Sequence, residues 1–378
     1  MTFVDNGKRA LKTPIAPRGE GSAGAGAPLA GAPFARSTPL TGAAPVTSGT
    51  SLSGSAPLTG STPPAAGATA IVAAAPQRAA QMLSDHEVAH RLDGPLTVTA
   101  ALERAMRMLS SRTDSPRLDA EILLGRVLGV SRSALIVRGA DPVSAETRRA
   151  YDELIACRRE GVPVAYLTGI REFWSLELDV TPDVLVPRPE TEVLVEHALG
   201  LLPKDAPLSV LDLGTGSGAI ALAIASERPL VCMTGVDVSE RALAVAAANS
   251  RKLGLTRIGW CAGSWYQPVQ GRRFDMIVSN PPYVASNDPA LERLAAEPAL
   301  ALSCGPTGLE AFESILDGAA LHLNPGGWLL LEHGNGQAAE VARMLENRRF
   351  EHIRSHADYS GNARVTLGAV RSPHKEPQ

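Results

Sequence analysis

The second half of the chain alternates between short apolar runs and helix-forming segments, and this alternation restricts the fold more than any other feature. Each run is short and bounded by turn residues, so we interpret the runs as strands. Strands that alternate with helices predict a parallel sheet covered by helices on both faces. The predicted strands are 208–213, 231–238, 258–261, 274–279 and 328–332, with two further strands near 351–355 and 363–370 that we expect to be antiparallel neighbours across the turn at 358–361.

The pattern before the sheet is different. Residues 96–160 have helical periodicity, and Thr99 is expected to cap the first helix, while Gly129 follows the end of the second. Strand-like alternation at 173–180, broken at 181–183, predicts a hairpin. We therefore divide the chain into a helical domain, a hairpin linker and an α/β domain, at residues 85–161, 162–190 and 191–372. Because the sheet needs no helical addition for its own core, we expect the helical domain to dock the substrate.

The first 84 residues differ from the rest in composition. From Gly19 to Pro76 they are almost entirely Ala, Gly, Pro, Ser and Thr. Such a tract cannot bury enough apolar surface to offset chain entropy, so residues 1–84 are predicted to be a disordered low-complexity tail. Three origins fit it, a true extension, a transit peptide and an upstream start codon, because it is poor in acidic residues but shows no amphipathic Arg-rich helix.

Charge and hydropathy argue against several classes of protein. The net charge is −3, and because the tail carries six basic and two acidic residues, the remainder carries about −7. An acidic folded part argues against binding through nucleic-acid phosphates. With no run of 18 apolar residues and no apolar signal segment near Met1, we expect a cytoplasmic protein that does not bind membranes. The four cysteines and eight histidines show no metal-ligand spacing, so we expect reduced thiols and no metal.

A glycine-rich turn follows the first predicted strand of the sheet. Glycine lets backbone approach a ligand closely, and the next helix directs free N–H groups and its positive dipole end toward that ligand. The strand–turn–helix context predicts a nucleotide-cofactor site, and the spacing also matches the Gly-x-Gly-x-x-Gly/Ala pattern of NAD enzymes. The residues of this turn are Gly214, Thr215, Gly216, Ser217 and Gly218.

A second motif, Asn280-Pro281-Pro282-Tyr283, follows the strand predicted at 274–279. Open α/β sheets bind ligands at the carboxyl ends of their strands. Because proline has no N–H and a fixed φ, we expect the carbonyls of Asn280 and Pro281 to be available as acceptors. With the Asn280 side-chain oxygen and the flat ring of Tyr283, they suit a planar NH2 group of an amide or a nucleobase.

Asp237 ends the second predicted strand, about 20 residues beyond the glycine turn, where an acidic residue accepts hydrogen bonds from ribose hydroxyls. This position fits NAD and S-adenosylmethionine equally. Two features favour the methyl donor. Asp212 precedes the first glycine, and the acceptors at Asn280–Tyr283 include no acid/base group of the kind that hydride transfer needs.

These motifs give the chain a close resemblance to a known family. Over about residues 97–370 it resembles S-adenosylmethionine-dependent methyltransferases, and most closely the protein-(glutamine-N5) methyltransferases that modify class I peptide chain release factors. The most specific motifs are Pro187-Arg188-Pro189-Glu190-Thr191-Glu192 and Asn280–Tyr283. The supporting motifs are Pro163–Gly169 with Glu172-Phe173, Glu297-Pro298 with Ala301-Leu302, Leu330–Gly334, and Asp358, Gly361 and Arg364.

The resemblance implies a fold and a reaction. The fold would be a methyltransferase Rossmann-like α/β sheet with a small N-terminal helical bundle and a connecting hairpin. The enzyme would transfer a methyl group from S-adenosylmethionine to the side-chain N5 of the glutamine in the Gly-Gly-Gln loop of class I release factors, supporting translation termination. The partners would be these release factors, with no direct nucleic-acid contact, and a monomer is the default expectation.

The resemblance also implies roles for single residues. Gly214 to Gly218 would hold the methionine part of the cofactor, Asp237 its ribose, and Trp265 would flank its adenine. Asn280, Pro281 and Tyr283 would be catalytic, the segment Asn280–Tyr283 would bind the substrate glutamine, and Asn280 would also contact the cofactor. For Arg188, Glu190, Glu192 and His333, the sequence allows either a bracing role or a functional one.

The chain departs from the family pattern at two places. Ser264 stands where many relatives have an acidic residue, and the stretch 288–298 is slightly shorter than usual.

Two alternative functions compete with this resemblance. Adenine-N6 DNA methyltransferases share the Asn-Pro-Pro-Tyr type of corner, but the acidic folded part and the lack of a Lys/Arg stripe argue against a nucleic-acid substrate. A non-catalytic scaffold would be expected to have lost the glycine turn or the acceptor corner, and both are intact.

Overall fold

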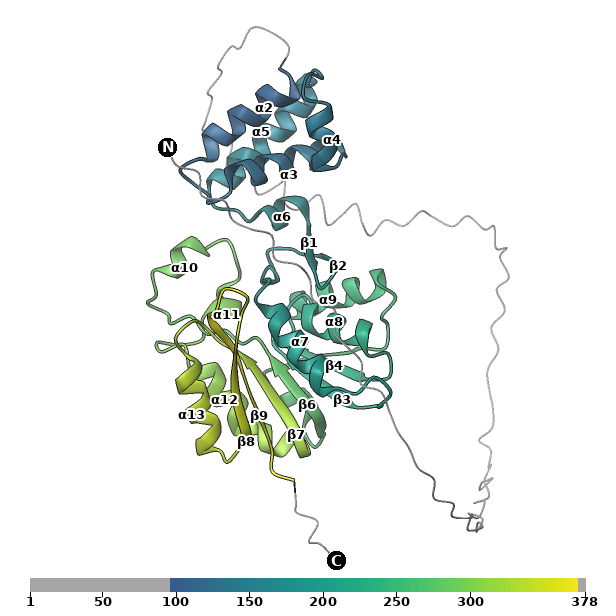
Figure 1. Ribbon diagram of the computed structural model, residues 1–378, viewed down its shortest axis with the longest axis vertical. Helices are drawn as coiled ribbons and strands as arrows, with labels where there is room; N and C mark the ends of the chain where they lie inside the picture. The colour runs from purple at the N-terminus through teal and green to yellow at the C-terminus, as the bar shows by residue number, and fades with distance from the viewer. Residues whose placement is uncertain (1–95, 373–378) are drawn as a thin grey trace, which may run out of the picture. The chain divides into compact units, whose positions relative to one another are not determined.

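The computed structural model describes residues 96–372 (Figure 1). The tail predicted at residues 1–84, together with residues 85–95 and 373–378, lies outside the described residues. The division of the chain into domains stays a prediction.

A group of helices forms the first described part of the chain. Its helices are α2 (Val98–Leu109), α3 (Pro116–Leu128), α4 (Arg132–Val137) and α5 (Ala145–Arg159). They pack around a core of their own that includes Leu109, Leu123 and Tyr151. The Tyr151 hydroxyl donates to the Ala120 carbonyl at 3.0 Å, which satisfies the one polar atom of this buried ring.

The N-cap of α2 is Thr97, and the prediction of Thr99 was wrong. Thr97 has extended backbone, with φ −84° and ψ 163°, and its hydroxyl accepts from the Ala100 N–H at 3.3 Å. Thr99 lies inside the first helical turn, where it cannot cap. The predicted end at Gly129 is confirmed, because this glycine follows α3 with a φ of 64°.

A linker connects the helices to the sheet. It contains the short helix α6 (Val164–Thr168) and an antiparallel hairpin of β1 (Ile170–Phe173) and β2 (Leu176–Asp179). The predicted hairpin therefore exists, but its turn is Trp174-Ser175 and not the segment 181–183. Both turn residues have positive φ, 52° and 58°, as two-residue hairpin turns require. No glycine or asparagine marks this turn in the sequence, so turn chemistry did not reveal it.

A seven-stranded sheet forms the second part, in the order β5-β4-β3-β6-β7-β9-β8. Strands β3 to β7 are parallel, while β9 is antiparallel to both β7 and β8. This confirms the predicted α/β sheet and the antiparallel final pair. The strands are β3 (Ser209–Leu213), β4 (Cys232–Asp237), β5 (Gly259–Ala262), β6 (Phe274–Ser279), β7 (Leu323–Glu332), β8 (Glu351–Ala357) and β9 (Ala363–Ala369).

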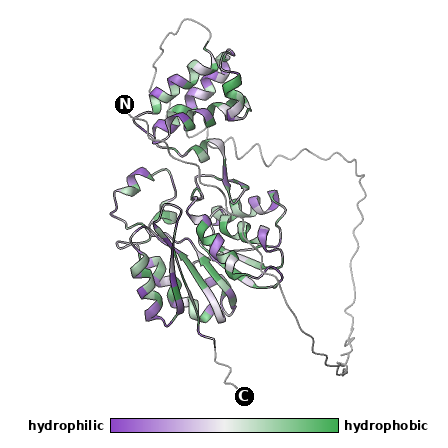
Figure 2. Ribbon diagram, in the orientation of Figure 1, coloured by the Kyte–Doolittle hydropathy of each residue, from purple (hydrophilic) through white to green (hydrophobic). Residues whose placement is uncertain are grey.

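Helices cover both faces of the sheet. One apolar cluster joins the strands to α7 (Thr191–Leu201) and α8 (Ala219–Glu227), and another joins them to α12 (Glu310–His322) and α13 (Ala338–Asn347). Neighbouring residues of the central strands β3, β6 and β7 alternate between the clusters, so these strands are apolar on both sides and are mostly green in Figure 2. The remaining elements are α9 (Glu240–Lys252), η2 (Gln267–Val269), α10 (Ala290–Arg293) and α11 (Ala299–Leu302).

Strand β7 begins earlier than predicted. The segment Asn324–Gly327, which precedes the strand predicted at 328–332, lies within β7. It still interrupts the ladder, because Phe274 pairs with Leu323 whereas Met276 pairs with Trp328, so extra residues of β7 are accommodated between two positions of β6. Within residues 96–372, no helix combines the length and apolar character needed to span a bilayer.

The strand order creates a switch point in the sheet. From β3 the chain continues to β4 and β5 on one side, and then returns to β6 and β7 on the other. The connections that leave the carboxyl ends of β3 and β6 therefore run in opposite directions. Open α/β sheets bind ligands at the crevice between two such strand ends. Leu213 pairs with Ser279 in parallel register. The glycine turn and Asn280 thus begin at adjacent strand ends.

Candidate functional site

The glycine turn is held against the end of β4. The N–H groups of Gly214 and Thr215 both donate to the Val236 carbonyl, at 2.9 and 3.0 Å. Gly214 and Gly216 have φ values of 70° and 55°, in the left-handed region that favours glycine. A Cβ on either residue would meet no atom within 4 Å. Glycine is therefore needed here for backbone conformation, and the space in front of the turn can admit a ligand.

Asp237, at the end of β4, has capacity for further hydrogen bonds. One carboxylate oxygen accepts from Gly216 N–H and the other from Ser239 N–H, both at 2.9 Å. A carboxylate offers about four acceptor sites, so room remains for the two hydroxyls of a ribose. Burial raises the pKa of Asp237, and the N–H groups of Ser239 and Gly216 act in the opposite direction.

Asp212 supports the turn from within the sheet. Its Oδ2 accepts from the Thr215 hydroxyl at 2.6 Å, and its Oδ1 has no partner among residues 96–372. Burial raises the pKa of Asp212 to about 7, although the Thr215 hydrogen bond lowers it. A buried carboxyl of this kind is present in both protonation states near neutral pH.

Trp265 lies on the loop that follows β5, next to the end of β4. The Gly263 N–H donates to the Asp237 carbonyl at 3.0 Å, which brings this loop beside Asp237. Trp265 is half-buried and has a φ of 48°, an uncommon conformation for a bulky residue and one often found at functional sites. The structure thus brings Trp265 to the same sheet edge as Asp237 and the glycine turn.

The Asn280–Tyr283 corner presents acceptors without partners. Within residues 96–372, no hydrogen bond reaches the carbonyl oxygens of Asn280 and Pro281. The next two carbonyls are occupied, since Pro282 accepts from the Cys304 thiol at 3.4 Å and Tyr283 accepts from the Gln337 amide at 3.1 Å. The carbonyls of Asn280 and Pro281, which were expected to be available as acceptors, therefore have no donor among residues 96–372.

The Asn280 side chain has a defined neighbour. Its amide nitrogen donates to the Thr191 hydroxyl at 3.2 Å. Thr191 is the first residue of α7 and is buried. This contact leaves the amide oxygen of Asn280 as the group available to a ligand.

Tyr283 provides a wall of the corner and not a base. Burial and then the nearby charge of Glu332 raise its pKa to about 12, while Arg364 and Arg188 lower it. The phenol therefore stays protonated at neutral pH. Its ring lies against Gly334, where an added Cβ would approach ring carbon Cδ2 to 3.3 Å. A side chain at position 334 would consequently displace the ring.

The segment Pro187–Glu192 is braced by contacts within the protein. Arg188 forms an ion pair with Glu297, whose second oxygen accepts from the Val186 N–H at 3.1 Å. Glu192 accepts from the Trp174 N–H at 2.9 Å. These contacts favour the bracing interpretation for Arg188 and Glu192. They connect this segment to the Glu297-Pro298 motif and to Trp174, which follows the Glu172-Phe173 motif.

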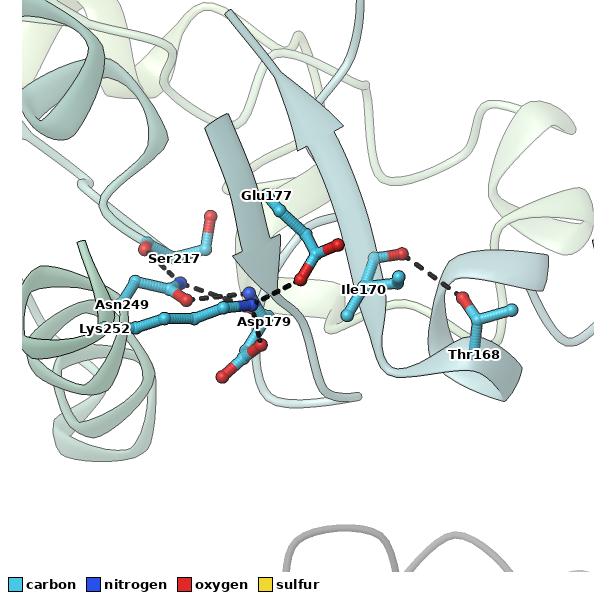
Figure 3. Close-up of polar contacts among 7 residues, drawn as sticks. All are labelled: Thr168, Ile170, Glu177, Asp179, Ser217, Asn249 and Lys252. Carbon is cyan, nitrogen blue, oxygen red and sulfur yellow. Dashed lines mark hydrogen bonds and ion pairs between the residues drawn. The ribbon is translucent and has the colours of Figure 1, made fainter. Parts of the chain in front are cut away.

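One residue that sequence analysis missed is Asn249, which is fully buried in α9. Its side chain accepts from Asp179 N–H at 2.7 Å and donates to the carbonyls of Asp179 and Ser217, both at 3.0 Å (Figure 3). Asn249 thereby joins β2 of the hairpin to the glycine turn. Its place on a stripe with Ala242 and Ala246 was the available signal, because an amide among buried apolar positions needs partners.

The sequence is similar to those of known methyltransferases. Two family models match the chain, the PrmC N-terminal domain at residues 100–169 and the methyltransferase small domain at residues 189–305. A release factor glutamine methyltransferase from Xylella fastidiosa strain Temecula1 is 45% identical over 251 residues, covering 66% of this chain and 91% of that protein. One from Burkholderia pseudomallei is 48% identical over 259 residues, covering 66% and 91%. A solved protein-(glutamine-N5) methyltransferase from Alicyclobacillus acidocaldarius is 34% identical, with coverage of 52% and 100% and a TM-score of 0.29.

Proposed function

Because the chain belongs to the release factor glutamine methyltransferase family, we propose that it methylates the side-chain N5 of the glutamine in the Gly-Gly-Gln loop of class I peptide chain release factors. The observation that carries this proposal is the acceptor set at the end of β6. The carbonyls of Asn280 and Pro281 and the Asn280 side-chain oxygen all lack a donor from the described chain. A primary amide supplies the matching donors.

The residues of the glycine turn fit S-adenosylmethionine, which supplies an activated methyl group. Gly214 to Gly218 would hold its methionine part, because the space in front of Gly214 and Gly216 is open. Asp237 would accept hydrogen bonds from its ribose with the acceptor sites that remain. Trp265, on the loop beside Asp237, would flank its adenine.

Asn280 and Pro281 would act by orienting a weak nucleophile. The lone pair of an amide nitrogen is delocalised into its carbonyl group. Acceptors at the Asn280 side-chain oxygen and the Pro281 carbonyl would hold both N–H bonds and direct the lone pair toward the methyl group. Positioning of this kind can supply roughly 7–11 kcal/mol of a barrier.

The same acceptors would stabilise the transition state electrostatically. As the nitrogen–carbon bond forms and the methyl group leaves its sulfur, positive charge develops on the nitrogen. Preorganised oxygens facing this charge are more effective in a site from which water is excluded. The methylated nitrogen becomes acidic and loses its proton to water, so no strong base is needed, in agreement with the raised pKa of Tyr283.

A labelling experiment tests this function. The purified protein is incubated with methyl-labelled S-adenosylmethionine and a class I release factor, and in parallel with the same factor carrying Ala in place of the Gln of its Gly-Gly-Gln loop. Label on the intact factor alone is expected. Absence of label on both, with cofactor binding confirmed, would overturn the proposal, and a parallel incubation with RNA and DNA would then show whether the substrate is a nucleic acid.

A further inference from the structure

A buried carboxyl group lies beside the acceptor corner. Leu331 of β7 pairs with Ser279 of β6 in parallel register, so Glu332 and Asn280 occupy equivalent positions at the ends of adjacent strands. Glu332 is 1% exposed, and its Oε2 has no hydrogen-bond partner among the described residues. Arg364, from the neighbouring strand, forms its ion pair with Asp358 instead, at 3.0 Å. An ionised group in such a place is costly, and the sheet does not require it.

Thr191 connects this carboxyl group to Asn280. Its oxygen accepts from the Asn280 amide nitrogen at 3.2 Å, and its side chain lies close enough to Glu332 to lower the pKa of that carboxyl group by hydrogen bonding. A threonine hydroxyl has one hydrogen to donate, and an ionised carboxylate can only accept. The direction of both bonds is therefore set by Glu332, and the nitrogen of Asn280 must face Thr191.

We propose that Glu332 is a positioning residue that acts through the Thr191 hydroxyl to fix the Asn280 amide with its oxygen, and not its nitrogen, toward the substrate NH2 group. This inference rests on the proposed function, because the orientation matters only if the substrate brings donors. In the reversed orientation, the Asn280 NH2 would face the NH2 of the substrate, and no hydrogen bond could form. A carboxylate suits the role because it has no donor that would permit the reversal.

Protonation of Glu332 would reverse the relay, since a carboxylic acid can donate to Thr191. Burial raises the pKa of Glu332 to about 7, the nearby Glu190 acts in the same direction, and Arg364 and Arg188 oppose it. Tyr283, the remaining titratable group facing Glu332, stays protonated. Burial lowers the pKa of the adjacent His333, and the hydrogen bond with the Gly334 backbone opposes this shift. Methyl transfer should therefore weaken as the pH falls through the pKa of Glu332.

The test measures kcat for a class I release factor, together with the affinity for S-adenosylmethionine, between about pH 5 and about pH 9. Thr191→Val removes the hydroxyl at nearly constant volume, and we expect kcat to fall roughly tenfold with unchanged cofactor affinity. Thr191→Ser keeps the hydroxyl and should restore most of the rate. Glu332→Gln can both donate and accept, so kcat should fall by a similar factor, and the decline of kcat at acid pH should disappear.

Thr234→Val is the matched control. Thr234 is also buried, and its hydroxyl accepts from Arg272 at 2.9 Å, but it lies within β4 away from the acceptor corner. We expect its kcat to stay within about twofold of the wild type. Thermal unfolding of each variant separates loss of fold from loss of orientation, and Glu332→Gln should unfold no earlier than the wild type because it removes a buried charge.

Three results would overturn the relay. They are an unchanged kcat in Thr191→Val, an acid decline of kcat that persists in Glu332→Gln, and losses of kcat that merely follow the fraction unfolded. In each of these cases the wild type would still methylate the release factor, so the proposed function would stand. A wild type that binds S-adenosylmethionine but does not methylate the factor would instead overturn both.

Discussion

At the scale of single residues, the site is defined by polar atoms that the protein leaves without partners. The carbonyls of Asn280 and Pro281 at the end of β6 accept no hydrogen bond from residues 96–372, and the buried carboxyl groups of Asp212 and Glu332 each keep one oxygen unpaired. Native proteins pair nearly all of their buried polar atoms. Unpaired atoms that gather at one edge of a sheet therefore indicate where a ligand completes the hydrogen bonding.

Asn280→Ala should slow methyl transfer. The substitution removes an acceptor facing developing positive charge, which is worth about 1–3 kcal/mol, or roughly a 5- to 150-fold loss in kcat. Steady-state kinetics with the release factor measure this loss. Asn347→Ala, at an exposed position at the end of α13, serves as the control and should have no effect. A wild-type rate in Asn280→Ala would contradict the proposed mechanism.

Asp212→Asn should stabilise the cofactor-free protein in a pH-dependent way. The pKa of Asp212 is about 7 in the folded protein, above its ordinary value, so the folded state binds more protons than the unfolded state between about pH 4 and about pH 7. The contribution of Asp212 to the stability of the wild type falls as the pH rises through this window, and the Asn variant lacks this loss. Its advantage, at most a few kcal/mol, should grow up to about pH 7 and then level off.

Unfolding midpoints of the two proteins, measured without cofactor at several pH values, give this difference directly. The comparison cancels the contributions of other groups, such as the histidines whose pKa values are lowered by burial. A difference that does not change with pH would show that Asp212 is ionised throughout.

At the scale of elements, the motifs act through the loops that they hold together. Glu297 accepts a hydrogen bond from the N–H of Val186 and forms an ion pair with Arg188. These contacts connect the loop before α11 to the segment that leads into α7. That segment ends at Thr191, which contacts Asn280. The position of the acceptor corner thus depends on a contact between two loops that lie far apart in the chain.

Glu297→Ala should therefore destabilise the protein by about 2–3 kcal/mol, because a buried N–H and a partly buried guanidinium both lose their partner. Denaturant unfolding measures the effect. Glu340→Ala removes a carboxylate that pairs with Arg343 on the surface of α13, and it should leave the stability nearly unchanged because solvent screens such a pair. Equal effects of the two substitutions would mean that the Glu297 contact contributes no more than a surface ion pair.

At the scale of the whole molecule, the hairpin, the sheet and the cofactor turn are coupled through α9. Asn249 binds both backbone groups of Asp179 in the hairpin and the carbonyl of Ser217 in the glycine turn. The hairpin is the segment that follows the helical part of the chain. The turn that would bind the cofactor therefore shares one buried side chain with the linker.

Asn249→Ala should weaken both stability and cofactor binding. It leaves three backbone polar groups without partners, at a cost of about 2–4 kcal/mol, and it releases one side of the glycine turn. Denaturant unfolding and calorimetric titration with S-adenosylmethionine measure the two effects. Lys252→Ala, which removes two ion pairs between the same helix and the same hairpin, should leave cofactor affinity unchanged. Lost stability with normal affinity in Asn249→Ala would limit its role to the hairpin.

The local features of this protein were readable in the sequence because local chemistry produces them. Apolar runs with turn residues between them specify strands, the spacing of glycines specifies the turn at 214–218, and two prolines after an asparagine specify a corner without N–H donors. Each of these depends on residues that are neighbours in the chain. The cap at Thr97 was not predicted because Thr99, two residues later, is an equally plausible capping residue. The hairpin turn at Trp174-Ser175 was not predicted because it contains no residue typical of such turns.

Contacts between distant segments were decided by the tertiary structure. No local pattern places β6 beside β3 and β7, yet this order sets Asn280 next to both the glycine turn and Glu332. The Thr191 contact and the three bonds of Asn249 likewise join segments remote in sequence. Residue types and short spacings specify which groups can react, but the folded sheet determines which of them meet, because burial of both sheet faces selects one arrangement of the strands.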